Sequence, residues 1–199
     1  MILETVTKGE RTQSEIVEAA YRLFLDKGYH GTSMRQIAES VGIALGGIYN
    51  HFSGKEDIFR AVLLAHHPYF DILPALMQAE GDTMEIILRD AARRMVAIME
   101  DRKDFLNLLF VELVEFKAKH FPEFFNNIFP EVLKFARRFA GRQKEFRSIP
   151  VPILARSFIG LFFSYVITEM LIGKHLPPEW QEGALDHFVD IYLHGVIAR

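Results

Sequence analysis

Apolar residues recur along this chain at the spacing of amphipathic helices, whereas the alternation typical of strands is scarce. In the first predicted helix the apolar positions fall on one face: Ile16, Ala20, Leu23 and Phe24. Gly28 is suited to end that helix. Shorter helices are predicted over about residues 34–41, 45–51 and 55–67, the first of them following the N-cap candidates Thr32 and Ser33.

The remainder of the chain is predicted to form longer helices, over about residues 83–100, 103–120, 124–141, 151–173 and 183–197. Pro74 and Gly81 mark a joint before them, Pro122 ends the second, and Pro130 breaks or kinks the third. The last carries an apolar stripe at helical spacing: Leu185, Phe188, Val189, Tyr192, Leu193 and Val196. The pattern therefore predicts an all-α protein.

Composition narrows the class of protein. The chain has 199 residues, 50% of them hydrophobic and none cysteine. An apolar content this high allows one or two packed domains and excludes disorder of the whole chain. The lack of cysteine excludes a disulfide, a thiolate zinc site and a cysteine nucleophile. Of the 18 Phe, 6 Tyr and 1 Trp, only six precede residue 61, which suggests two functional parts.

No targeting or membrane segment is predicted. The N-terminus lacks a basic region followed by an apolar run, so it does not resemble a signal peptide. Arg156 and Glu169 interrupt the most apolar stretch and leave 12 uncharged residues between them. Because a bilayer span needs about 20 apolar residues, we predict a buried helix and a soluble, cytoplasmic protein without a membrane partner.

Residues 37–43, IAESVGI, match the steric needs of a helix-turn-helix. Two helices that cross steeply need a small residue at their closest approach, which Ala38 supplies. The turn needs a residue that tolerates positive φ, which Gly42 supplies. Ile37, Val41 and Ile43 then supply apolar contacts on both sides of the turn, so a DNA-binding helix-turn-helix is predicted.

A longer motif strengthens this interpretation. The segments GYHGTSMRQIA (28–38), VGI (41–43), GGIYNHF (46–52) and KE (55–56) resemble the N-terminal domain of TetR-family transcriptional regulators. The resemblance covers roughly residues 11–63. It implies a tail over 1–10, a three-helix DNA-binding domain with a linking fourth helix over 11–66, and a larger helical effector-binding and dimerisation domain over 67–199.

The resemblance places the helix over about residues 45–51 in the major groove. The predicted DNA-contacting residues are Arg11, Thr32, Ser33, Leu45, Gly46, Gly47, Tyr49, Asn50, His51 and Lys55. Among these, Lys55 looks like the family's phosphate-binding lysine. The two glycines either let backbone approach DNA or relieve a crowded helix crossing, and Tyr49 either donates to a phosphate or packs in the core. Ile48 and Phe52 are predicted core residues.

Two features depart from a strongly DNA-binding sequence. Ala44 stands where the family often has a capping Ser or Thr, and alanine caps poorly. Residues 1–60 carry seven Lys and Arg against eight Asp and Glu. Attraction to DNA must therefore come from the placement of charges and from helix N-termini, and we predict few phosphate contacts and a shallow dependence of affinity on salt.

Several later helices are apolar on more than one face, so their side chains either fill a core or line a pocket for a lipophilic, aromatic ligand. The predicted ligand-binding residues are Met95, Met99, Phe105, Leu109, Glu112, Phe116, Phe124, Phe158 and Phe162. Glu112 is conspicuous because burying an unpaired carboxylate is costly. It either pairs with Arg93, Arg94 or Arg156, reaches solvent, or meets the ligand.

A second copy of the chain is the expected protein partner. Ser157, Gly160 and Ser164 form a stripe of small residues that would let another helix come close. In the resembled family the last two helices pair with those of a second subunit, so we predict a homodimer interface that also includes Phe188 and Tyr192. Packing of these helices within one chain is the alternative.

These observations predict a ligand-responsive DNA-binding regulator, which we expect to be a repressor released from a palindromic operator by a small lipophilic effector. The alternative is a DNA-binding regulator without an effector, acting through protein partners. A helical enzyme would need convergent acid and base residues, and no such pattern stands out. No cofactor is expected, and the scattered histidines lack an acidic cluster at metal-ligand spacing.

Overall fold

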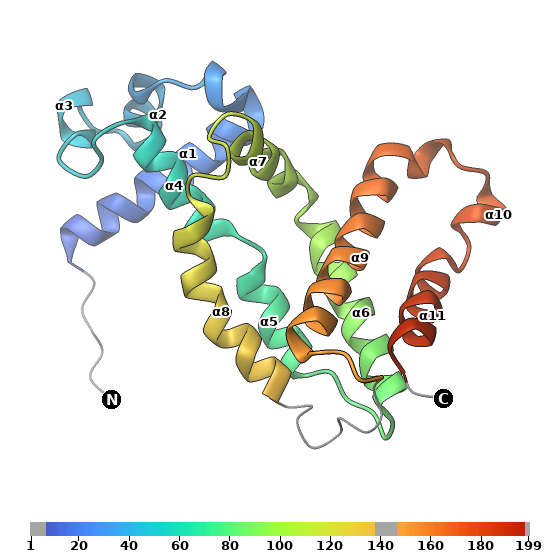
Figure 1. The fold of residues 1–199 in the computed structure, drawn as a ribbon. Coiled ribbons are helices and arrows are strands. Elements are labelled where there is room, and N and C mark those ends of the chain that lie inside the picture. The colour runs from blue at the N-terminus through green and yellow to red at the C-terminus, as the bar shows by residue number, and fades with distance from the viewer. Residues whose placement is uncertain (1–6, 138–146, 198–199) are drawn as a thin grey trace. The chain divides into compact units, whose positions relative to one another are not determined.

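The computed structural model describes residues 7–137 and 147–197, and the predicted all-α fold is confirmed (Figure 1). The helices are α1 (Lys8–Gly31), α2 (Met34–Val41), α3 (Leu45–Ile48), α4 (Lys55–His66), α5 (Tyr69–Met77), α6 (Met84–Asp101), α7 (Lys103–Val114), α8 (Phe121–Arg137), α9 (Val151–Ile172), the 3-10 helix η2 (Gly173–His175), α10 (Pro178–Gln181) and α11 (Ala184–Val196).

Contacts divide the chain into two compact units. The first unit comprises Met1–His67 and Asp104–Phe124, and the second comprises Pro68–Lys103 and Phe125–Arg199. Almost all of α7 therefore packs with the N-terminal helices, although the sequence analysis assigns it to the effector-binding domain. The functional division at residue 66 remains a prediction.

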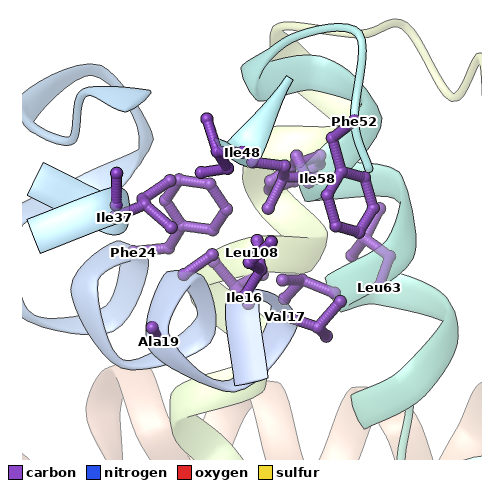
Figure 2. Packing of buried hydrophobic residues seen from close by; sticks show 14 of the residues in the cluster. Ile16, Val17, Ala19, Phe24, Ile37, Ile48, Phe52, Ile58, Leu63 and Leu108 are labelled. Carbon is purple, nitrogen blue, oxygen red and sulfur yellow. The ribbon is translucent and has the colours of Figure 1, made fainter. Parts of the chain in front are cut away.

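The core of the first unit joins α1, α2, α3, α4 and α7 (Figure 2). Ile16, Ile37, Ile48 and Ile58 are fully buried there, and Leu108 reaches the same cluster from α7. Each such aliphatic side chain contributes about 1.5–3 kcal/mol on burial. Because Ile48 and Phe52 lie in this cluster, the prediction that they are core residues is confirmed.

The second unit is built on α6, α9 and α11, which pack on one another. Phe162 and Val189 are buried there, and the Tyr192 hydroxyl donates to the carbonyl oxygen of Leu154 at 2.9 Å. Burial raises the pKa of Tyr192 to about 12. Ion pairs from Arg89 to Asp190 and from Arg93 to Asp186 join α6 to α11 at the edge of this core.

Three expectations about helix boundaries are wrong. Pro74 lies inside α5 and does not mark a joint, and Pro130 lies inside α8 and does not break it, while a kink there stays a prediction. The helix from Lys103 ends at Val114 rather than near residue 120. Lys117 and Ala118 after it adopt left-handed φ values of 52° and 60°. The chain thus turns sharply before Phe121, and we call residues 115–120 the α7–α8 corner.

The prediction that the most apolar helix is buried is also wrong. By length and composition Val151–His175 could cross a membrane, although helices of soluble proteins pass the same test, and it is the only such helix in the described residues. Only 22% of its most apolar window is buried. Ile153 and Ile159 are about half exposed, and Ile191 on α11 is about two-thirds exposed. This unit therefore presents an apolar surface on α9 and α11.

Candidate functional site

The α2–turn–α3 segment has the geometry predicted from its sequence. Ser33 caps α2 by accepting from the Gln36 backbone N–H, and the Gln36 side chain accepts from the Ser33 N–H. Gly42 adopts the left-handed conformation, with φ 79° and ψ 28°. The next N–H, from Ile43, donates to the carbonyl oxygen of Ala38 at 3.0 Å, which closes the turn as in a common helix C-cap.

The α3 helix is short and has an open surface. Ala44 makes no side-chain cap, as predicted. A Cβ built on Gly46 would meet nothing within 4 Å, and one on Gly47 would lie 3.9 Å from the Cβ of Ile43. A crowded helix crossing within this unit therefore does not explain these glycines, and the close approach of backbone to DNA stays a prediction.

Most of the predicted DNA-contacting residues are at least partly exposed, on α3, just after it, or at the N-terminal ends of α1 and α2. Arg11, Ser33, Leu45, Gly46, Tyr49 and Asn50 are exposed, while Gly47 and His51 are half-buried. Tyr49 is 53% exposed, so the alternative that it packs in the core is not supported. We call these eight residues the α3 surface. Whether they contact DNA stays a prediction.

Thr32 and Lys55 have other partners. The Thr32 hydroxyl is buried and donates to the carbonyl oxygens of Gly28 and Leu23. The Lys55 ammonium donates to the carbonyl oxygens of Tyr29 and Thr32, and burial lowers the pKa of this lysine. Both side chains are thus bonded within the unit, and whether either also contacts a phosphate stays a prediction.

A small cavity lies between α4 and α7 in the first unit, with a volume of about 20 Å³, and it is partly open to solvent. Two of the predicted ligand-binding residues, Leu109 and Glu112, line it. The remaining lining residues are Arg60, Leu63, Leu64, His67, His120 and Phe121. Its wall is almost entirely apolar, and burial lowers the pKa of His67 to about 3, so His67 is neutral near pH 7.

Glu112 is buried and bound to the α7–α8 corner. Its carboxylate accepts from the His120 backbone N–H, and one of its oxygens lies 2.8 Å from His120 Nδ1. The other ring nitrogen of His120 lies 3.6 Å from Glu56 on α4. Arg93 and Arg94, predicted as partners of Glu112, instead pair with Asp186 and Asp90.

The other predicted ligand-binding residues are divided between the two units. Phe105 and Phe116 pack in or against the core of the first unit. Four more are buried in the second unit, namely Met95, Met99, Phe158 and Phe162. The side chain of Phe124 is outside the described part of the structure.

Some of the predicted dimer-interface residues are exposed, and others are partly or fully buried within the second unit. Ser157, Gly160 and Ser164 are exposed on α9, and a Cβ on Gly160 would meet nothing within 4 Å. Phe188 is half-buried against Tyr165. Tyr192 is corrected, because its ring packs on Phe158 and its hydroxyl is bonded inside the unit. It is a core residue rather than an interface residue.

Tyr29 and the two histidines that line the cavity are not predicted as functional residues from the sequence. Tyr29 lies within the matched motif, so it could have been singled out, but His67 and His120 carry no local signal. No group of three or more metal-ligating side chains occurs in the part of the chain that the structure describes.

Comparison with known proteins identifies this helix-turn-helix. Residues 16–62 match the family model described as "Bacterial regulatory proteins, tetR family". The chain belongs to the TetR family. Like other TetR-family proteins it is a helix-turn-helix transcriptional regulator rather than an enzyme.

The similarity to other transcriptional regulators extends along the chain. The uncharacterised regulator YvkB of Bacillus subtilis (strain 168) is 24% identical over 94% of this chain and 98% of its own. A crystal structure assigned to the family, from Mesorhizobium loti MAFF303099, superposes with TM-score 0.74 at 24% identity over 96% of this chain and all of that one.

A third relative is NalD, described as the secondary repressor of the MexAB-OprM multidrug efflux pump of Pseudomonas aeruginosa. It superposes with TM-score 0.64 at 20% identity over 96% of this chain and 98% of its own. At these identities, both structural matches establish the fold alone.

Proposed function

We propose that this TetR-family regulator is a cytoplasmic repressor that a small lipophilic effector releases from a palindromic operator. The observation that carries the proposal is the pairing of two features in one unit. The α3 surface is exposed at a capped helix-turn-helix, and an apolar cavity adjoins α4, the helix that follows it. NalD, which has the same fold, is itself described as a repressor.

The α3 surface suits a contact with the major groove. Its bare glycines would allow backbone to approach DNA, and Tyr49, Asn50 and His51 would supply donors for phosphates or base edges. Leu45 would contact an apolar group such as a thymine methyl. In a two-fold dimer, two such surfaces about 34–36 Å apart, or a multiple of that, would bind the half-sites of a palindrome.

The apolar wall of the cavity and the neutral His67 would suit an effector that is small and largely uncharged. Because the cavity volume is only about 20 Å³, α4 and α7 would have to move apart to admit it. Binding would change the packing of α4 against α7. To release DNA, the effector must bind the DNA-free conformation more tightly than the DNA-bound one. A filled cavity that favours one position of α4 would meet this condition.

The exposed apolar surface of α9 and α11 supports a homodimer. An uncovered surface of this kind marks an interaction site in soluble proteins. The small residues Ser157, Gly160 and Ser164 would let the helices of two copies approach closely. Such pairing would also explain why the most apolar helix of the chain is mostly uncovered within one copy.

The DNA part is tested by selecting binding sequences from random duplex DNA with the full chain. We expect an enriched inverted repeat, and enrichment of no sequence would contradict a sequence-specific operator. The effector part is tested with phenol and indole as graded probes, followed by measurement of affinity for the selected duplex.

Leu109→Trp, which fills the cavity, should abolish the response to these probes, whereas Leu113→Trp on the exposed side of α7 should not. A probe that binds the cavity tightly and leaves DNA affinity unchanged would contradict induction. That outcome would favour the alternative of a regulator that acts through protein partners.

A further inference from the structure

We propose that Trp180 anchors the homodimer by packing on the apolar surface that α9 and α11 of a second copy expose. Trp180 lies on α10, in the connection between α9 and α11 (Figure 1). It is the only tryptophan of the chain, and it is 66% exposed within one copy. The inference rests on the proposed homodimer and adds to it a contact outside the two long helices.

The segment that carries Trp180 is held firmly in place. The Gln181 side-chain amide donates to the carbonyl oxygen of Gly173 at 3.0 Å and to that of Leu176 at 2.7 Å. The Trp180 backbone N–H donates to the carbonyl oxygen of Pro177 at 2.9 Å. Because binding need not order such a segment further, more of the contact energy of its side chains remains as affinity.

The exposed apolar surface of α9 reaches the segment that carries Trp180. Leu171 and Ile172, at the C-terminal end of α9, are 61% and 48% exposed. Gly173 directly follows them, and the hydrogen bond from Gln181 holds α10 against this end of the helix. Trp180 is therefore carried beside the surface through which we propose that the homodimer forms.

A second copy of the chain is the partner that these features favour. TetR-family regulators act as dimers. A two-fold interface uses the same residues of both copies, so one exposed tryptophan contributes to it twice. Tryptophan is among the residues that dominate the binding energy of protein interfaces, and each one buries roughly 150–250 Å². Trp180 thus offers a large contact area to a dimer.

The charges near Trp180 argue against a membrane surface as its partner. Lys174, His175, Glu179 and Glu182 are exposed in this segment. A segment that binds anionic lipids is typically rich in Lys and Arg. Here a single lysine is outnumbered by two carboxylates, so the segment has no electrostatic attraction to an anionic bilayer.

Because Trp180 is the only tryptophan, its fluorescence reports on the contact directly. The full chain is diluted through the range in which sedimentation detects dissociation of the dimer. The emission of Trp180 and its quenching by acrylamide are recorded at the same concentrations. We expect dissociation to shift the emission to longer wavelength and to increase the quenching, with the midpoint seen by sedimentation, because the ring becomes exposed to water.

A dimer whose dissociation leaves emission and quenching unchanged would overturn the role of Trp180 and leave the homodimer intact. A chain that is monomeric at every concentration would overturn both. Vesicles of phosphatidylglycerol should not shift the emission. A shift with vesicles but not with dilution would overturn the proposal in favour of a membrane contact.

Substitutions measure the contribution of the ring. Trp180→Ala should weaken dimerisation at least about 100-fold, because a tryptophan anchor is commonly worth about tenfold or more and each dimer loses two. For a dimer too tight to dilute, the rate of subunit exchange should rise correspondingly. Trp180→Phe should recover most of the affinity.

Phe125→Ala is the matched control, because it removes an aromatic ring that is 57% exposed on α8. It should leave dimerisation unchanged. Equal effects of Phe125→Ala and Trp180→Ala on dimerisation would overturn a specific contact. Lower thermal stability of Trp180→Ala with undiminished dimerisation would also overturn the proposal, since the ring would then act within one copy.

Discussion

Glu112 stabilises the path of the chain after α7. Its buried carboxylate accepts from the His120 N–H and faces the His120 ring, across a corner where two residues adopt left-handed φ. Left-handed backbone at residues other than glycine costs free energy and persists only where surrounding contacts enforce it. Here the enforcing contact comes from a side chain eight residues earlier in the chain.

Replacing this carboxylate should therefore destabilise the first unit. Glu112→Leu leaves the His120 N–H without its acceptor, and we expect a loss of about 1–3 kcal/mol in the free energy of unfolding, measured by denaturant titration. The control is Glu115→Leu, which removes an exposed carboxylate paired with His30 and should change stability by less than about 0.5 kcal/mol. Equal effects of the two variants would contradict a structural role for Glu112.

His67 should make stability depend on pH. Burial lowers its pKa from 6.5 to about 3, so the unfolded chain binds a proton at this residue more readily than the folded chain. The free energy of unfolding is therefore unaffected by His67 above pH 6.5. It falls as the pH drops from 6.5 toward 3, by at most about 1.4 kcal/mol per pH unit.

Unfolding titrations between pH 7 and 5, where most carboxylates stay ionised, should show a smaller loss in His67→Gln than in the parent chain. An unchanged pH dependence would mean that His67 is not buried in its neutral form.

At the scale of single elements, α3 combines low helix propensity with an open surface. Gly46→Ala introduces a methyl group that meets nothing within 4 Å. It should raise the free energy of unfolding by up to ~1 kcal/mol, because alanine favours helix over glycine. If backbone approaches DNA there, affinity for the selected duplex should fall at least tenfold.

Gly195→Ala is the control for the change in helix propensity, because Gly195 lies in α11 of the second unit and a Cβ there would also meet nothing within 4 Å. If Gly46→Ala leaves the affinity for DNA unchanged, Gly46 does not contact DNA. Binding assays paired with denaturation curves distinguish the two effects.

The elements differ in how well the sequence predicted them. The spacing of Ala38 and Gly42 predicts the α2–turn–α3 geometry because local sterics decide it. Pro74 and Pro130 were misleading, since a helix can continue through a proline and lose one hydrogen bond. The end of α7 could not be predicted, because the Glu112–His120 contact determines it and neither left-handed residue is a glycine. For the same reason the distant carbonyl partners of Lys55 carry no signal in its own segment.

At the scale of the whole molecule, the uncovered surface of α9 and α11 predicts a homodimer that a single charge can disrupt. Gly160→Arg places a long cation on this surface and should give a monomer in sedimentation experiments. Affinity for a palindromic duplex should then fall by at least about 100-fold, because the two half-sites are no longer bound by linked subunits. Leu113→Arg, at an exposed apolar residue of α7, should leave the oligomeric state unchanged.

Charge distribution predicts a weak dependence of DNA binding on salt. In the first unit Arg11, Arg35 and Arg60 form ion pairs with nearby carboxylates, and Lys55 is bonded to backbone. These carboxylates compete with phosphates for the cations, so we expect few phosphate contacts, and each contributes about 0.9 to the slope of log affinity against log salt. A measured slope as steep as about −10 would contradict this distribution.

The discontinuity of the first unit has a consequence for protein engineering. A biosensor made by fusing residues 1–67 to the effector domain of another regulator would lack Leu108 and Phe116, which pack in and against the core of this unit. It would also lack the acceptor that Glu123 provides for Arg60. A portable DNA-binding module from this chain must carry residues 104–124 as well, so a successful graft is an insertion of two segments rather than a single fusion.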